Sequence, residues 1–291
     1  MLITRYIRFL TYEKNYSEHT LLSYEKNMRS FESFLKDQGM DITQADAFAV
    51  RAYLAAQKEK GIQPRSINQN ISSLRSFYKF GVREKLIVRN PMERIRLMRT
   101  PKHLPTVVPE DKLCDLLDSD VFEKSYAGLR DHLIMEMLFS TGIRRSELLS
   151  IEEKDVDVYQ QQLRIMGKGK KQRIIPITRG LSILLTRYLE EKKLQVPGGS
   201  RYLLVDEKGN ALKAPAIYKT VQRYLSMITS QKKRSPHVLR HTFATALLNR
   251  GASINDIKEL LGHASLASTQ IYAHNSVERL KSIYKQAHPK A

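Results

Sequence analysis

Apolar side chains recur at intervals of three and four residues through the first ninety positions, which is the period of an amphipathic helix. The three clearest helices carry the apolar positions from Leu21 to Leu35, from Phe48 to Leu54 and from Ile67 to Tyr78. Ser17 and Thr43 precede the first two and are residue types that cap helices. This half of the chain predicts a bundle of four or five helices.

The second half is mixed. Leu129–Phe139 is almost entirely apolar and predicts a buried helix that ends at Thr141-Gly142. Residues 162–177 predict a β-hairpin with a glycine-containing turn, in which Pro176 either makes the second strand an edge or ends its pairing. The chain then returns to helices, the last short one over residues 276–287. The predicted fold class is mainly α with a small antiparallel β-sheet in the C-terminal domain.

A basic segment separates the two patterns. The Asn90-Pro91 step should end the last N-terminal helix, because a residue before proline avoids the helical region. Five basic residues and one acid lie between positions 89 and 106. The predicted organisation is therefore a domain over residues 1–88, a linker over 89–106 and a domain over 107–291. The linker is either simply solvated or lies against phosphate, and its charge favours phosphate.

The charge composition of the chain indicates which class of partner it binds. The chain has 49 Lys and Arg against 30 Asp and Glu, a net charge of +19. Such a field attracts polyanions, so nucleic acid is the first expectation and an anionic membrane surface the second. The single cysteine, Cys114, excludes an internal disulfide and disfavours a cysteine-rich zinc site. Arg5 and Arg8 interrupt the apolar N-terminus, and no run is long enough to cross a bilayer, which predicts a cytoplasmic protein without membrane insertion.

Two basic side chains share one face near a predicted helix start. Ser235-Pro236 opens that helix, and His237 and Arg240 are three residues apart on it. Together with the unpaired N–H groups of a helix start they form a candidate phosphate site. A solvated basic helix end is an equally good interpretation of this segment alone.

Five further positions are weak signals singly. Glu147 lies three residues after Arg144 and could hold it by a bidentate ion pair, although a surface ion pair is the commoner case. Lys168 lies between two glycines at a hairpin tip, where lysines are usually only solvated. His263 follows Gly262 on a predicted turn, and Tyr272 lies on the next helix, where such residues are more often structural.

These positions occur in an ordered set of segments that resembles the tyrosine recombinase (phage integrase) family, closest to its bacterial Xer subgroup. The resemblance covers nearly the whole chain. Its segments are TGIRRSEL (141–148), GKGKKQR (167–173), HVLRHTFAT (237–245), LGH (261–263) and TQIY (269–272). It implies a two-domain, C-shaped DNA clamp whose N-terminal part is a SAM-like core-binding domain.

The resemblance also implies roles. Tyr272 would be the nucleophile that becomes joined to a 3′ phosphate, and Arg144 and Arg240 would neutralise the phosphate. Lys168 would be the general acid, His237 would take or orient the tyrosine proton, and His263 would donate to the phosphate. Glu147 would support Arg144; Arg145 competes with Arg144 but lacks the family spacing to Glu147. No cofactor or metal is expected, because the phosphotyrosyl bond conserves the energy of the cut bond.

The implied partners are double-stranded DNA with a specific recombination site and a tetramer on two duplexes. The tetramer would be homomeric or formed with a paralogous recombinase, exchanging strands through a Holliday junction, with a septal DNA translocase as a further partner. Chromosome dimer resolution and mobile-element integration or excision both fit. A type IB topoisomerase and a non-catalytic basic DNA-binding protein are the alternatives; the N-terminal bundle disfavours the first and the full residue set the second.

The tail after the nucleophile has an apolar face formed by Val277, Leu280, Ile283 and Tyr284. The resemblance implies that this face docks on a neighbouring subunit of a cyclic assembly. Packing on its own domain is the alternative.

Overall fold

The computed structural model describes residues 2–100, 106–167, 172–262, 284 and 286–290. The chain divides into two compact units, Met1–His103 and Leu104–Ala291. They are called the N-terminal unit and the C-terminal unit, and each is described by itself.

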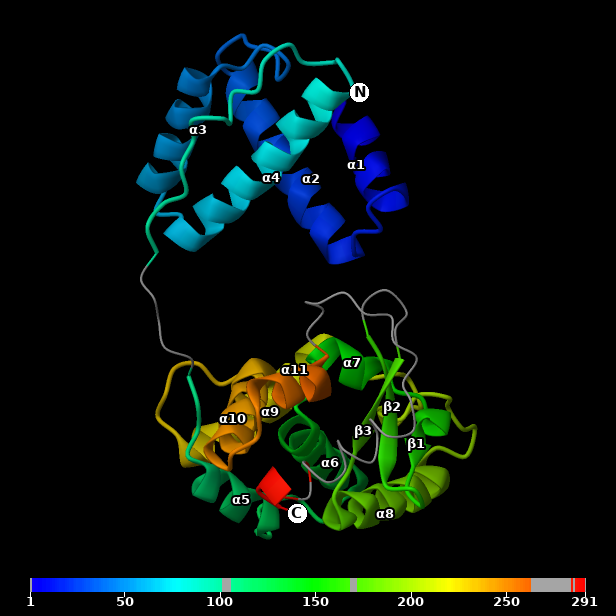
Figure 1. Cartoon of the computed structure of the whole chain (residues 1–291). Coiled ribbons are helices and arrows are strands. Elements are labelled where there is room, and N and C mark those ends of the chain that lie inside the picture. The colour runs from blue at the N-terminus through cyan, green and yellow to red at the C-terminus, as the bar shows by residue number, and fades with distance from the viewer. Residues whose placement is uncertain (1, 101–105, 168–171, 263–283, 285, 291) are drawn as a thin grey trace. The chain divides into compact units, whose positions relative to one another are not determined.

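In its described part, the N-terminal unit consists of helices joined by turns and loops and has no strand (Figure 1). Its core is rich in aromatic side chains, among them Tyr6, Phe31, Phe77 and Tyr78, all fully buried. The predicted bundle is confirmed. Its helices are α1 (Leu2–Tyr12), α2 (Glu18–Lys36), α3 (Ala47–Glu59) and α4 (Pro64–Arg83).

Two predicted helix boundaries in this unit are wrong. Asp46, not Thr43, caps α3, because its carboxylate accepts the main-chain N–H of Ala49; Thr43 instead bonds to the side chain of Asp41 in a turn. Helix α4 ends at Arg83, well before the Asn90-Pro91 step, and Lys85 then adopts a left-handed backbone (φ 58°).

The first part of the segment predicted as a linker packs on the N-terminal unit. Met92 and Ile95 are buried in its core. The Asn68 amide pairs with both main-chain groups of Met98, at 2.7 and 2.9 Å. The backbone through Met98 is therefore part of this unit, while Arg94, Arg96 and Arg99 remain exposed.

The C-terminal unit surrounds a buried helix, α6 (Tyr126–Thr141), that packs against α8, α9 and α10 (Figure 1). This is the apolar helix predicted from the sequence, and its end at Gly142 is confirmed. The other helices are α5 (Glu110–Asp118), α7 (Arg145–Ser150), the 3₁₀ turn η1 (Glu153–Asp155), α8 (Arg179–Gln195), α9 (Ala214–Ile228), α10 (Pro236–Asn249) and α11 (Ile254–Leu261).

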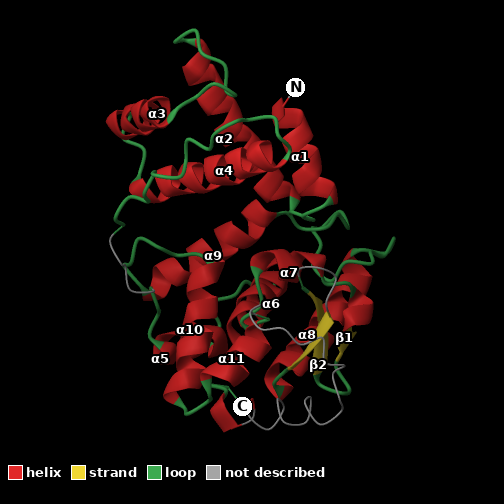
Figure 2. Cartoon of the chain, turned by 45° about the horizontal axis from the view of Figure 1, so that its top comes forward, coloured by secondary structure: helices red, strands yellow, loops and turns green. Residues whose placement is uncertain are grey.

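One small antiparallel sheet lies at one side of this unit (Figure 2). Its order is β1 (Val156–Asp157), β2 (Gln162–Met166) and β3 (Gln172–Pro176). The predicted hairpin is confirmed, with Arg173 opposite Ile165 and Pro176 opposite Gln162. Strand β3 is an edge of the sheet, which is the first of the two outcomes expected for Pro176. The mainly α fold class with a small sheet is thus confirmed.

The described end of the C-terminal tail packs on its own unit. Tyr284 is buried with Phe243, Leu247 and Leu261, and its hydroxyl donates to the Ser140 carbonyl at 2.8 Å. In this single chain Tyr284 therefore packs on its own unit, which is the alternative expected from the sequence. Docking of the tail on a neighbouring subunit stays a prediction. Val277, Leu280 and Ile283 lie outside the described residues.

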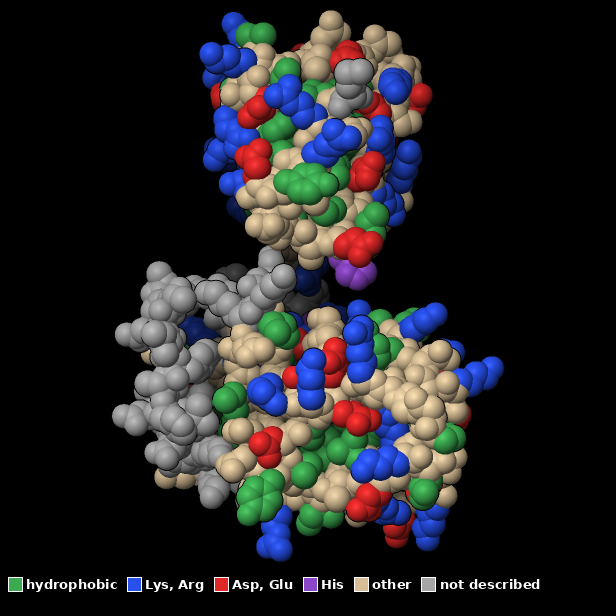
Figure 3. Space-filling model, turned by 90° about the vertical axis from the view of Figure 1, so that its right-hand side faces the viewer, with side chains coloured by type: hydrophobic (Ala, Val, Ile, Leu, Met, Phe, Trp, Pro, Cys, Tyr) green, Lys and Arg blue, Asp and Glu red, His purple; other side chains and the backbone are tan. Residues whose placement is uncertain are grey.

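Basic side chains are distributed over both units. On the face drawn in Figure 3, Lys and Arg lie on each unit with Asp and Glu between them, rather than in a single patch. Among the described helices, none is long and apolar enough to cross a membrane.

Candidate active site

Gly142 determines where Arg144 lies. It ends α6 with a left-handed backbone (φ 59°), and a Cβ at this position would lie 2.4 Å from the ring of Phe243. Glycine alone combines that backbone with so close a contact. The chain turns through Ile143 and begins α7 with Arg144 at its N-cap position.

Glu147 holds Arg144 by its backbone as well as by its side chain. The main-chain N–H of Arg144 donates to Oε2 of Glu147, and Nη1 of Arg144 donates to Oε1, each at 2.8 Å. The predicted ion pair is confirmed, but its bidentate form is wrong. A glutamate at the third helical position reaches back to the N-cap N–H, which occupies the second oxygen.

The bidentate partner of Glu147 is Arg173, which the sequence analysis gave no role. Its Nη1 and Nη2 donate to Oε1 and Oε2 of Glu147 at 3.1 and 2.9 Å, and both side chains are buried. The alternation of side chains along a strand indicates that Arg173 faces inward. It lies two residues before the buried Ile175 and shares its face of the strand. An inward arginine requires a buried anionic partner.

The charge of Glu147 follows from these contacts. Burial raises the pKa of its carboxyl group, but the hydrogen bonds from Arg173 and Arg144 outweigh burial and leave the pKa below its usual value. Glu147 is therefore a carboxylate at neutral pH and offsets part of the positive charge around it.

Arg240 extends from the first turns of α10, which begins at Ser235-Pro236 as predicted. Its Nη1 donates to the Gly142 carbonyl at 2.6 Å and its Nη2 to the Leu261 carbonyl at 2.8 Å. Burial and the nearby Arg144 lower the pKa of Arg240 to about 10. The guanidinium is still a cation at pH 7, in a partly desolvated place where its charge acts strongly.

Three arginines converge on the C-terminal end of α11. Arg173 donates through Nε to the Leu260 carbonyl at 3.2 Å, Arg240 to Leu261, and Arg144 to the Gly262 carbonyl at 3.3 Å. The last carbonyls of a helix lack intrahelical partners and form the negative end of its dipole. This helix end and Glu147 together let three like charges lie close to one another.

Gly262 gives the arginines room at that helix end. It closes α11 with a left-handed backbone (φ 63°), as the sequence predicted. A Cβ there would lie 2.8 Å from Nη1 of Arg173. The helix end can therefore contact the guanidinium only with glycine at this position.

His237 lies on the exposed side of the first turn of α10. Partial desolvation, then the charges of His241, Arg240, Arg145 and Arg144, lower its pKa below the ordinary histidine value. The imidazole is therefore neutral at pH 7 and able to accept a proton.

The structure thus brings together Arg144, Glu147 and Arg240, with His237 within their electrostatic reach. Arg145, the competitor of Arg144, is exposed at the start of α7. Lys168, His263 and Tyr272 lie outside the described residues. Two of them adjoin the cluster in the chain: Lys168 lies between β2 and β3, and His263 follows Gly262.

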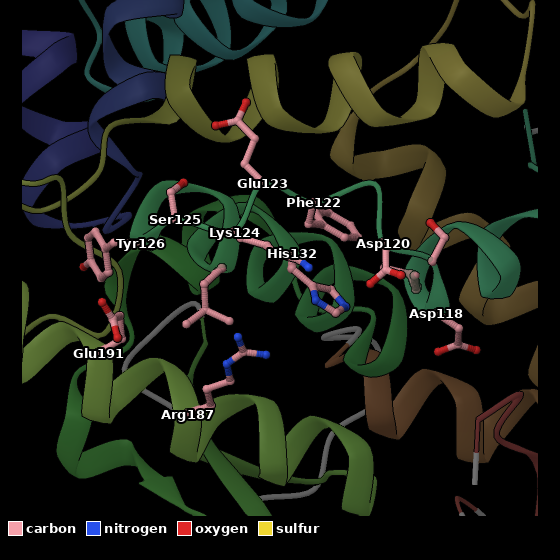
Figure 4. A pocket seen from close by; sticks show the side chains of 13 residues that line it. Asp118, Asp120, Phe122, Glu123, Lys124, Ser125, Tyr126, His132, Arg187 and Glu191 are labelled. Carbon is pink, nitrogen blue, oxygen red and sulfur yellow. The ribbon is translucent and has the colours of Figure 1, made fainter.

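A pocket of about 560 Å³ lies elsewhere on the C-terminal unit, between α8 and the segment joining α5 to α6 (Figure 4). Its lining includes Asp118, Glu123, His132 and Arg187 but none of the predicted site residues. Within the described ranges, no group of three His, Cys, Asp or Glu side chains is arranged to hold a metal ion. The arginine cluster is therefore the candidate active site.

Comparisons with known proteins show the family to which the chain is similar. Residues 108–279 match the model of the phage integrase family, and residues 3–85 match the phage integrase N-terminal SAM-like domain. The chain is 38% identical to the tyrosine recombinase XerC of Bacillus subtilis (strain 168), over 98% of this chain and 95% of the relative. It is 37% identical to that of Syntrophus aciditrophicus (strain SB), over 100% and 98%.

A solved structure shares the fold. A XerH site-specific recombinase bound to a palindromic difH substrate, in a post-cleavage complex, matches with a TM-score of 0.74 and 23% identity, over 96% of this chain and 83% of that chain.

Proposed function

The chain belongs to the phage integrase family and is a site-specific tyrosine recombinase of the Xer type, and we propose that it cuts and rejoins double-stranded DNA through Tyr272. The observation that carries this proposal is the pair Arg144 and Arg240, held close together by Glu147 and the end of α11. Two neighbouring guanidinium groups can together stabilise the doubly negative transition state at one phosphate. Two arginines in separate surface ion pairs would not be placed to do so.

The two guanidinium groups bind the scissile phosphate. A phosphodiester repels nucleophiles by its charge, and two planar donors can hold its two non-bridging oxygens. Because protein contacts fix these arginines before DNA arrives, little reorganisation is needed as charge develops.

The remaining residues move protons around that phosphate. The Tyr272 oxygen forms a bond to phosphorus and the bond to the 5′ oxygen breaks, which leaves a 3′-phosphotyrosyl link. Neutral His237 accepts or orients the tyrosine proton, while Lys168 gives a proton to the departing 5′ oxygen. His263 donates to the phosphate. Attack by another strand's 5′ hydroxyl reverses these steps and rejoins the DNA.

The assembly is a tetramer on two duplexes that passes through a Holliday junction, as a homomer or with a paralogous recombinase. Both units bind the duplex. The similarity to XerC proteins over nearly their full length favours chromosome dimer resolution over mobile-element integration. A septal DNA translocase is a further proposed partner.

Covalent trapping in cells tests the proposal and identifies the DNA site in the same experiment. Protein purified from cells under denaturing conditions should carry DNA on Tyr272, and sequencing that DNA gives the site. A duplex of that sequence, nicked near the cut so that the released fragment diffuses away, should then yield a slowly migrating protein–DNA band on a denaturing gel.

The matched variants are Tyr272→Phe and Tyr159→Phe. Tyr159 is 92% exposed and serves as the control tyrosine. Tyr272→Phe should bind the duplex and give no covalent band, whereas Tyr159→Phe should behave as the wild type. A covalent band with Tyr272→Phe would show that another residue is the nucleophile.

A further inference from the structure

We propose that Arg173 is a positioning residue that aligns the β2–β3 hairpin with the phosphate-binding arginines; this inference rests on the proposed function. Arg173 lies in the β-sheet of the C-terminal unit. It is the second residue of β3, opposite Ile165 of β2. It thus lies on a strand that begins four residues after Lys168, the proposed general acid.

Arg173 fixes the carboxylate that fixes Arg144. Each oxygen of Glu147 accepts from Arg173 and also from Arg144: Oε1 from both Nη1 atoms, and Oε2 from Nη2 of Arg173 and the main-chain N–H of Arg144. The planar fork of Arg173 therefore determines the carboxylate plane. A lysine carries the same charge but cannot make both contacts at once.

A third contact ties Arg173 to α11. Its Nε donates to the Leu260 carbonyl, one residue before the carbonyl that accepts from Arg240. All three guanidinium nitrogens thus have partners, two in Glu147 of α7 and one in the carbonyl at the end of α11. The side chain links these two helices to its own strand, β3. A shift of the hairpin is transmitted to both phosphate-binding arginines.

These contacts exclude Arg173 from the phosphate itself. Its side chain is 7% exposed, against 35% for Arg144. It acts through Glu147 and the helix end, and a buried ion pair of this kind contributes more to alignment than to net stability.

The test compares two DNA substrates, one ordinary and one with sulfur at the 5′-bridging position of the scissile phosphate. Sulfur leaves without a proton, so the rate ratio of sulfur to oxygen substrate rises when the general acid is lost or displaced. A less stable variant has less folded protein, which lowers the cleavage rates of both substrates by the same factor. Reduced stability alone therefore leaves the ratio of the two rates unchanged.

Arg173→Lys should lower single-turnover cleavage of the oxygen substrate on the order of 100-fold and raise the sulfur-to-oxygen ratio on the order of tenfold. DNA affinity should stay within a few-fold of the wild type. Lys168→Ala is the benchmark for complete loss of the acid, with a larger rise in the ratio.

The matched control is Lys192→Met. Lys192 is likewise buried and pairs with Glu153 and with the carbonyls of Ser200 and Tyr202, none of which belongs to the arginine cluster. This variant should lose stability and keep the wild-type ratio.

If Arg173→Lys does not fold, Gly262→Ala replaces it in the test. This variant keeps Arg173, but its new Cβ would lie against the Arg173 guanidinium and displace it. A wild-type sulfur-to-oxygen ratio in a folded Arg173→Lys variant, or in the folded Gly262→Ala variant that replaces it, overturns the inference. If the wild type forms no covalent complex, or Lys168→Ala shows no rise, the proposed function or the role of Lys168 fails instead.

Discussion

Arg173 and Glu147 form a buried, doubly hydrogen-bonded ion pair in which each guanidinium Nη atom donates to a different carboxylate oxygen, at 3.1 and 2.9 Å. Both oxygens also accept from Arg144. One carboxylate thus organises two arginines, only one of which faces solvent. The pair links strand β3 to the start of α7.

Glu147→Gln should destabilise the C-terminal unit by about 3–5 kcal/mol at pH 7, because it leaves the buried Arg173 cation without its counter-charge. The effect depends on pH. The pKa of Glu147 is lowered in the folded protein, so its contribution is present above the unfolded pKa and is lost as pH falls through the lower folded pKa. The difference between wild type and variant should shrink below about pH 4.5.

Urea unfolding at a series of pH values, followed on the C-terminal unit, measures this difference. Glu147→Asp is the control, since it keeps the charge on a shorter side chain and should retain the pH dependence. A constant difference from pH 7 to pH 3 would mean that the loss comes from packing rather than charge.

Arg144→Lys and Arg240→Lys should each slow cleavage by about 10²–10³-fold while DNA affinity changes only a few-fold. Lysine keeps a positive charge but loses the fork that contacts both the protein and the phosphate. Arg145→Lys is the control: Arg145 is exposed beside the cluster and its exchange should leave the single-turnover rate nearly unchanged. A large loss at Arg145 with none at Arg144 would exchange their roles.

Periodicity predicted the elements better than their ends. The apolar spacing in α2, α4 and α6 depends only on the helical repeat, which is local information. The cap of α3 depends on which side chain reaches the N–H of Ala49, and Asp46 does so while Thr43 bonds to Asp41. The end of α4 is likewise set by the chain turning back at Lys85 to bury Ile87.

The structure brings together part of the predicted site, while the places of Lys168, His263 and Tyr272 stay predictions. Arg144, Glu147 and Arg240 occur in segments whose spacing resembles the family, and the structure brings them together. Arg173 lies in one of those segments but was given no role, because its partner is 26 positions away and only the folded sheet shows the contact. Its inward place in β3 was the available signal.

Binding to duplex DNA should weaken steeply with salt, because each neutralised phosphate contributes about −0.9 to the slope of log K against log salt. Replacing the exposed Arg94, Arg96 and Arg99 together with alanine should make the slope less negative by up to about 2.7 if all three contact phosphates. The matched triple exchange to lysine keeps the charge and should leave the slope unchanged. An unaltered slope in the alanine variant would place this segment away from the backbone.

The tail should dock on its own unit more weakly as pH falls. His288 is buried, its Nε2 donates to the Ser140 carbonyl at 3.0 Å and its Nδ1 accepts the main-chain N–H of Lys290. Burial lowers the pKa of His288 to about 3, against 6.5 for the free side chain. The undocked tail therefore binds the proton more strongly, and docking should lose about 1.4 kcal/mol per pH unit between 6.5 and 3.

Hydrogen exchange of the peptide containing residues 284–290, measured from pH 7.5 to 5.5 and corrected for intrinsic exchange, reports this docking. Protection should fall over that range in the wild type and stay constant in His288→Gln, whose amide donates to the same carbonyl without titrating.

Truncation after Asn275 should destabilise the C-terminal unit, because it removes the Tyr284 ring from the core and both donors from Ser140. If the truncated chain is as stable as the full chain and fails only to form tetramers on paired sites, the tail acts on the neighbouring subunit after all.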